Sequence, residues 1–151
     1  MTSGAAEDQF NLQRFVDAQA GVFESVRHEL SIGRKSGHWI WFVFPQMIGL
    51  GLSPTSQFFG IGSFSEAQAY LAHPVLGPRL IEATQLILTV KGRTLREIFG
   101  APDDMKFRSS MTLFARAAPP GSVFKDALDR VCSGEEDHKT IELLKRAEGA
   151  A

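Results

Sequence analysis

The sequence predicts an all-α protein: a single compact domain of about seven or eight helices, several of them short, around an aromatic-rich core. Three observations support this fold class. Apolar residues recur at helical spacing along most of the 151 residues. Residues that start or stop helices separate these stretches at short intervals. The chain also carries 12 Phe and 2 Trp, which is enough large apolar surface to fill one core.

The clearest helix is expected between residues 11 and 33. Phe10 and Asn11 resemble a hydrophobic staple followed by an N-cap, with Phe15 placed to contact Phe10. Gly33 supplies the C-terminal stop. The apolar residues of this helix fall within about 120° of a helical wheel; they are Leu12, Phe15, Val16, Val22, Phe23, Val26 and Leu30.

A second long helix is expected to begin at Pro74, with His73 as its N-cap and proline at its favoured first position. Its apolar stripe is broad, so this helix should be largely buried. The centre of the stripe consists of Leu76, Leu80, Ala83, Ile87 and Val90.

Six further signals predict shorter helices. Two have the spacing of capping boxes, and the others place Ser, Asp or Pro at a helix start. In chain order they are Ser53-Pro54, Ser63 with Glu66, Thr94 with Glu97, Pro102-Asp103-Asp104, Ser122 and Asp137. The helix from Pro102 should run to about Ala118, and the helix from Ser122 should end near Gly134.

The segment Trp39–Phe44 is ambiguous. Its aromatic and β-branched residues favour a buried strand by propensity. A lone strand needs a partner, however, and no other stretch of the sequence offers one. We therefore interpret the segment as a buried helical turn.

Composition limits the functional class. The net charge is −1 and the pI is about 6.4, so the chain lacks the basic field that nucleic-acid binding relies on. It has one cysteine, no basic-then-apolar leader and no apolar run of about 18 residues. We expect a cytoplasmic protein without a membrane span, in which disordered tails at 1–8 and 148–151 flank a domain at 9–147.

No motif for a metal or a cofactor is present. The four histidines and Cys132 lack the short ligand spacings of metal sites, and there is no Walker loop or serine nucleophile elbow. The two glycine loops, at 49–54 and 60–63, are interpreted as tight turns between helices. We therefore expect neither a metal nor a cofactor.

Polar residues among the aromatics mark the candidate site. Gln19 lies within the apolar stripe of the first helix, and a buried amide requires a hydrogen-bond partner. In the segment 37–51, His38 could act as an acid or base, while Trp39 and Gln46 could line a pocket for a flat ligand. The alternative is that the aromatics are core and that Gln19 and His38 bond the backbone.

A third polar segment is 106–114. On a helix, Lys106 and Ser110 share one flank, and a cation next to a hydroxyl can hold a phosphate or carboxylate. Ser109 and Ser110 are a serine pair inside a helix, which also suggests hydrogen bonds between helices. Anion contact and helix packing are equally compatible with this segment.

Several of these motifs resemble the DUF1810 family, a domain of unknown function. They are Phe15-Val16-Asp17-Ala18-Gln19, His38-Trp39-x-Trp41-x-x-Phe44-Pro45-Gln46, Gly49-Leu50-Gly51-x-Ser53, Tyr70-Leu71-x-His73-Pro74-x-Leu76-Gly77-x-Arg79-Leu80, Lys106-x-x-Ser109-Ser110-Met111-Thr112-Leu113-Phe114 and Asp137-x-x-Thr140. The resemblance runs from about Phe10 to Leu144 and implies a mainly helical fold. Phe59 stands where the family often has tyrosine, which argues against a role for a hydroxyl there.

Two hypotheses about function remain. In the first, the domain binds or transforms a small, polar, anionic metabolite of nucleotide-like character. Four side chains would converge on this ligand: His38, Gln46, Lys106 and Ser110. Gln19 and Arg79 would lie behind them. In the second, the polar groups tie irregular helices together, and the protein is an interaction or structural module without a small-molecule ligand; the sequence leaves open whether it is an enzyme.

Overall fold

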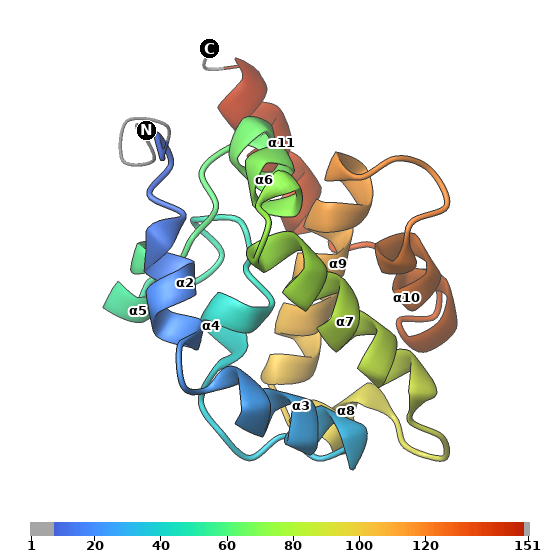
Figure 1. Cartoon of the computed structure of the whole chain (residues 1–151). Coiled ribbons are helices and arrows are strands. Elements are labelled where there is room, and N and C mark those ends of the chain that lie inside the picture. Colours follow the sequence, from blue (N-terminus) through green and yellow to red (C-terminus); the bar gives the residue numbers. More distant parts are fainter. Residues whose placement is uncertain (1–7, 150–151) are drawn as a thin grey trace.

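A computed structural model describes residues 8–149, which form ten α-helices and no strand (Figure 1). The all-α prediction is confirmed, but the expected seven or eight helices are too few. The helices are α2 (Gln13–Gln19), α3 (Phe23–Ser31), α4 (Ile40–Val43), α5 (Pro54–Phe58), α6 (Phe64–Ala72), α7 (Leu76–Thr89), α8 (Leu95–Phe99), α9 (Asp103–Ala117), α10 (Val123–Val131) and α11 (His138–Gly149). An isolated parallel bridge joins Met47 to Ile61.

The expected single helix from 11 to 33 is wrong, because the chain breaks between α2 and α3. Ala20 is extended, and Gly21 has a φ of 74°, a left-handed conformation that glycine adopts without steric cost. Asn11 is not the N-cap, since its own φ is 54°. The Asp8 carboxylate caps α2 instead, accepting hydrogen bonds from the backbone N–H of Leu12 (2.6 Å) and Gln13 (3.1 Å).

Most other start signals act as expected. The hydroxyls of Ser53, Ser63 and Ser122 each accept a backbone N–H at the start of α5, α6 and α10. Thr94 and Glu97 form a complete capping box at α8.

The N-terminal ends of helices α6 and α7 differ in detail from the prediction. The carboxylate of Glu66 accepts from Gly62 N–H (2.8 Å) and from Arg14, so the capping box at Ser63 is only half formed. Helix α7 begins at Leu76, two residues later than expected, and the His73 Nδ1 accepts from the N–H groups of residues 75 and 76.

Helices α7 and α9 are the long central elements of the fold (Figure 1). Helix α9 contacts α4, α6, α8, α10 and α11, while α7 contacts α3, α6 and α10. Aromatic rings of neighbouring elements pack against α9: its Phe107 lies 5.0 Å from Phe44 and 5.1 Å from Phe99, measured between ring centroids. Tyr70 joins this core at 5.3 Å from Phe114.

The ambiguous segment Trp39–Phe44 contains the single helical turn α4, so its interpretation as a helical turn is confirmed. Trp39, Ile40, Val43 and Phe44 are buried, which explains the strand-like composition. The intervening residues Trp41 and Phe42 are half-buried on the other side of the turn. This side of α4 carries the candidate site.

Of the expected tails, residues 1–7 and 150–151 lie outside the described part of the chain. Asp8 caps α2, and residues 148 and 149 belong to α11. The longest described helix, α9, has 15 residues, and none of the described helices has the length and apolar character needed to cross a bilayer.

Candidate functional site

Gln19 is buried at the end of α2 and is fully engaged by groups of the protein. Its Nε2 donates to the Phe42 carbonyl (2.7 Å) and to the Tyr70 hydroxyl (3.3 Å), and its Oε1 accepts from Arg79 (3.2 Å). The Arg79 guanidinium also lies 5.1 Å from the ring centroid of Phe23. The predicted residues Gln19 and Arg79 therefore belong to one closed network that links α2, α4, α6 and α7.

The Tyr70 hydroxyl is the acceptor at the centre of this network. Burial raises the pKa of Tyr70 well above its ordinary value, even though the hydrogen bond from Gln19 and the nearby Arg79 and Arg14 act in the opposite direction. Tyr70 therefore stays neutral, and the network holds α4 in place without carrying a charge on the phenol.

Trp39 is likewise engaged inside the fold. Its indole Nε1 donates to the Glu29 carboxylate (2.9 Å), which also accepts from the N–H of Ser36 (2.8 Å) and of Gly37 (2.9 Å). The ammonium of Lys35 lies 5.1 Å from the Trp39 ring centroid. Burial alone would raise the pKa of Glu29, but the three donors outweigh it and lower the pKa below its ordinary value.

Ser109 connects α9 to the start of α11. Its Oγ lies 3.1 Å from both the Met105 carbonyl and the Asp137 carboxylate, to which it can donate. The same carboxylate accepts from the Thr140 N–H (3.0 Å) and from the Thr140 hydroxyl, and the Asp137 N–H donates to Thr112 Oγ1 (2.9 Å). Asp137 therefore caps α11 as expected, and Ser109 helps to fasten that cap to α9.

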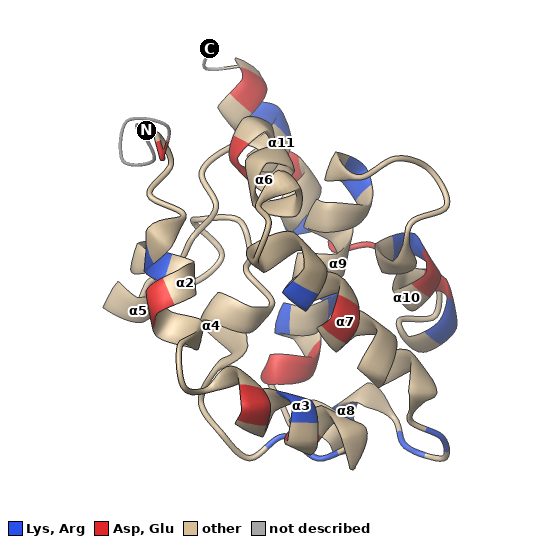
Figure 2. Ribbon diagram, in the orientation of Figure 1, with Lys and Arg blue, Asp and Glu red and all other residues tan. Residues whose placement is uncertain are grey.

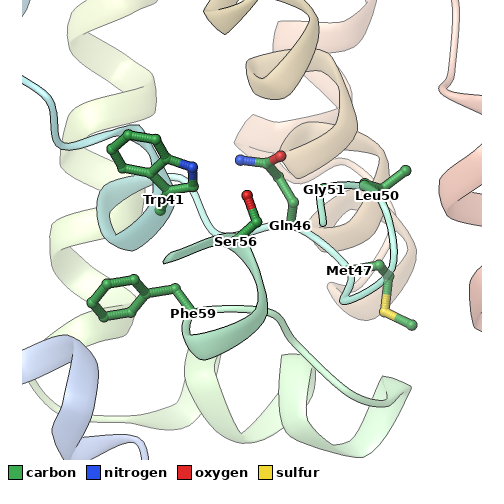
Figure 3. Close-up of a pocket in the computed structure, with 7 residues that line it drawn as sticks. All are labelled: Trp41, Gln46, Met47, Leu50, Gly51, Ser56 and Phe59. Carbon is green, nitrogen blue, oxygen red and sulfur yellow. The ribbon is translucent and has the colours of Figure 1, made fainter. Parts of the chain in front are cut away.

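A small cavity of about 10 Å³, enough for one water-sized group, opens next to α4. Its lining residues are Trp41, Gln46, Met47, Leu50, Gly51, Ser56 and Phe59. Figure 3 shows the Trp41 indole nitrogen, the Gln46 amide and the Ser56 hydroxyl turned toward one another across this space. Gly51 is required here, because a Cβ atom would lie 2.5 Å from Ser56 Oγ.

The Trp41 side of this cavity differs from the networks above in having an unpaired donor. Trp41 Nε1 is buried and has no hydrogen-bond partner among the described residues. Gln46 Nε2 makes one long bond, 3.4 Å, to the Phe44 carbonyl. The cavity therefore presents N–H donors that the fold does not use.

Lys106 of α9 lies directly over Trp41. Its ammonium is 4.9 Å from the Trp41 ring centroid and 3.4 Å from the Asp103 carboxylate. Asp103 is shared, since it also pairs with Lys35 at 2.7 Å. Ser110, one turn along the same flank of α9, is fully buried and its Oγ has no partner within the described chain.

The structure brings some of the predicted residues together and separates others. Gln46 and Lys106 both adjoin Trp41, with Ser110 on the flank of Lys106. His38 is exposed and does not line the cavity. Trp41, Ser56 and Phe59 were not among the predicted site residues. The available signal for Trp41 was its position two residues from the buried Trp39, which in a helical turn places the two rings on different sides.

The single cysteine has no exposed thiol. Cys132 is buried, and burial raises its pKa to about 11, against the opposing effect of the neighbouring Arg108. Such a thiol carries little thiolate at neutral pH. In the described part of the chain, no three His, Cys, Asp or Glu side chains lie close enough together to hold a metal ion.

Comparison with known proteins assigns this chain to a protein family. Residues 9–144 match the model of the family described as "Protein of unknown function (DUF1810)". The chain belongs to the DUF1810 family. The crystal structure of the conserved hypothetical protein Rv1873 from Mycobacterium tuberculosis, at 1.38 Å, is similar to this DUF1810 chain, with 56% sequence identity and a TM-score of 0.89. The match covers 91% of this chain and 99% of that protein. No curated protein matches.

The DUF1810 motifs contribute to two different places in this structure. Gln19, Tyr70 and Arg79, from two of the motifs, form the closed network. Trp41 and Gln46, from one motif, line the cavity, and Lys106, from another, lies over the Trp41 ring. The family resemblance thus includes both a structural network and the candidate site.

Proposed function

We propose that this DUF1810 protein binds a small, polar, anionic metabolite of nucleotide-like character, one oxygen of whose anionic group enters the cavity next to Trp41. The observation that carries the proposal is the buried indole N–H of Trp41, which has no partner among the described residues and faces this cavity (Figure 3). An unpaired buried donor costs about 1–3 kcal/mol, so a ligand oxygen that accepts this hydrogen bond is favoured there.

The groups around the indole match an anion. The Gln46 amide supplies N–H donors, and the Lys106 ammonium above the ring supplies positive charge. Hydrogen bonds from a cation to a phosphate or carboxylate are among the strongest in proteins. Phe59, Leu50 and Met47 provide apolar walls for the uncharged part of the ligand.

The closed network supports the site without contacting the ligand. Gln19 bonds the carbonyl of Phe42, the residue next to Trp41, and Arg79 holds the Gln19 amide oxygen. We assign both as positioning residues that fix α4. Ser110, one turn beyond Lys106 on α9, is fully buried and does not line the cavity.

The alternative hypothesis, a module without a small-molecule ligand, explains part of the polar pattern. Gln19, Trp39 and Ser109 all make internal hydrogen bonds, as packing alone requires. Internal hydrogen bonding does not account for the unpaired Trp41 indole, and this feature favours the binding function.

The test is isothermal titration and thermal shift with three probes: inorganic phosphate, AMP and ADP-ribose. We expect at least one probe to bind and to raise Tm, since a ligand at 100 times its Kd adds about 2.7 kcal/mol. Lys106→Met and Trp41→Phe should each weaken binding about tenfold or more. Lys139→Met, at an exposed position on α11, is the control and should bind as the wild type does. Equal affinities in all four proteins would place the ligand elsewhere, and no response to any probe would overturn the proposal.

A further inference from the structure

Four basic side chains gather at the end of the molecule where α3 and α7 finish. Arg34 follows α3, Lys91 and Arg93 follow α7, and Arg96 is on α8; all four are exposed. Figure 2 shows these blue segments near the lower edge of the ribbon, in the chain after α3 and in the loop after α7. We call the four residues the basic surface.

Packing between the three segments that carry these residues brings the chain at Arg34 close to Arg93 and to α8. A Cβ atom at Gly33, next to Arg34, would lie 3.2 Å from Cδ of Arg93. The N–H of Lys35, on the other side of Arg34, donates to the Ile98 carbonyl at 2.8 Å, which ties this strip of chain to α8. The basic surface is therefore built from segments 60 residues apart that the fold holds against each other.

The charges of the basic surface are not neutralised nearby. None of the four makes an ion pair with a residue that the structure describes, whereas Lys35 and Lys106 pair with Asp103 and Arg27 pairs with Glu82. Glu97, the acid next to Arg96, accepts the Thr94 N–H in the capping box of α8. A local excess of positive charge thus stands on a chain whose net charge is −1.

Helix dipoles explain only part of this excess. The C-terminal ends of α3 and α7 carry partial negative charge, which favours cations nearby. The attraction to a helix end acts only within the last turn of the helix, and one cation at each of the two ends is enough for it. Four exposed cations exceed this requirement, and Ile32 at the C-cap of α3 is itself 54% exposed.

We propose that the basic surface docks an acidic segment of a partner protein, with carboxylates on the four cations and an apolar side chain on Ile32. Three of the four cations are arginines, whose guanidinium matches a carboxylate in two-point geometry. Arginines around an apolar centre are also typical of protein interfaces.

Other polyanions fit this surface less well. Single-stranded nucleic acid is held by base stacking on aromatic rings, and the exposed aromatic residue of the described chain, Phe58, belongs to α5 next to the Trp41 cavity. Stable attachment to a membrane requires a second anchor beside a polybasic patch. Ile32 alone, at the C-cap of α3, does not provide one.

The test uses a fluorescein-labelled peptide of eight acidic residues with one central leucine, measured by anisotropy with the full chain at 50 and 300 mM NaCl. We expect measurable binding at 50 mM that weakens at least tenfold at 300 mM, because such contacts are screened by salt. R93E/R96E should weaken binding at 50 mM by at least tenfold. The matched control K139E/K145E, which reverses two exposed lysines of α11, should leave it within about twofold.

Parallel titrations use a 20-nucleotide single strand of mixed sequence and vesicles that contain phosphatidylserine. Tighter binding to either of them than to the acidic peptide overturns the proposal, as does equal loss of peptide binding in the two double variants. If R93E/R96E fails to fold by circular dichroism, R34E/K91E takes its place with the same expectation. The binding of phosphate or AMP at Trp41 should be unchanged in these variants, so failure here is distinguishable from failure of the proposed function.

Discussion

Two polar clusters lie among the aromatic rings of this protein, and they differ in how completely their hydrogen bonds are made. Around Gln19, each polar atom of the amide has a partner: Phe42, Tyr70 and Arg79. Around Trp41, the indole N–H has no partner in the described chain and the nearest cation lies over the ring. The first arrangement stabilises the fold, and the second leaves binding capacity free.

The same contrast recurs between two adjacent serines of α9. Ser109 can donate to Met105 and Asp137, whereas the hydroxyl of Ser110 is buried without a partner. Ser109 and Ser110 are the same residue type and both are buried, so the groups that surround each hydroxyl decide its role. The substitutions that follow test this contrast, from the largest expected effect on stability to the smallest.

Replacing Gln19 by methionine should cause the largest loss. The side-chain volume is nearly kept, but the Phe42 carbonyl and the Tyr70 hydroxyl lose their donor inside the core. Each unsatisfied group costs about 1–3 kcal/mol, so we expect about 2–5 kcal/mol and a Tm lower by about 5–15 °C. Gln85→Met, on the exposed side of α7, is the control and should change Tm little. A loss below about 1 kcal/mol in urea unfolding would show that the network is not structural.

The two tryptophans should respond unequally to the same change. Trp39→Phe removes a hydrogen bond to the ionised Glu29, which is worth about 1.5–3 kcal/mol, in addition to the smaller ring. Trp41→Phe removes an N–H that has no partner in the described chain. We therefore expect Trp39→Phe to cost about 1.5–3 kcal/mol more than Trp41→Phe in chemical denaturation. Equal losses would contradict the distinction between the hydrogen-bonded indole of Trp39 and the unpaired indole of Trp41.

The serine pair predicts effects of opposite sign. Ser109→Ala breaks the link to Asp137 and should cost about 1 kcal/mol. Ser110→Ala removes a buried hydroxyl that has no partner in the described chain, so it should be neutral or stabilise by up to about 1 kcal/mol. Differential scanning calorimetry of the two single variants measures both. A destabilised Ser110→Ala protein would indicate that its hydroxyl is satisfied in solution, for example by a bound water.

Much of the fold could be predicted from local signals. The hydroxyl caps at Ser53, Ser63, Thr94 and Ser122 identified four helix starts, because a cap acts within three residues of the helix that it begins. The break after Gln19 was not predicted, because the apolar stripe continues across it with helical spacing. The position of Gly21 was the available signal, since glycine permits the left-handed conformation that separates α2 from α3.

The candidate site was less predictable, because hydrogen-bond partners lie far apart in sequence. Gln19 meets Tyr70, 51 residues away, and Arg79, 60 residues away. The residue types indicated polar groups near aromatics, but which of them remain unpaired depends on tertiary packing. His38, an imidazole between Gly37 and Trp39, was predicted as a site residue because of its chemistry. In the structure its side chain is exposed, and Trp41 lies at the site instead.

The smallest expected effect is a change in stability at acid pH. It concerns Glu29, whose carboxylate accepts the hydrogen bond of the Trp39 indole. The pKa of Glu29 is lower in the folded protein than its ordinary value of 4.5, since three hydrogen bonds to its carboxylate outweigh the effect of burial. Glu29 therefore contributes stability that is present above about pH 4.5 and is lost as the pH falls through its folded-state pKa. Glu29→Gln keeps one acceptor oxygen but cannot titrate, so its free energy of unfolding should fall less steeply than that of the wild type below pH 4.5. Urea unfolding at several pH values between 3 and 6 measures this slope. Parallel profiles for the two proteins would mean that the Ser36, Gly37 and Trp39 donors do not favour the ionised carboxylate, and the segment around Trp39 would then be held by packing alone.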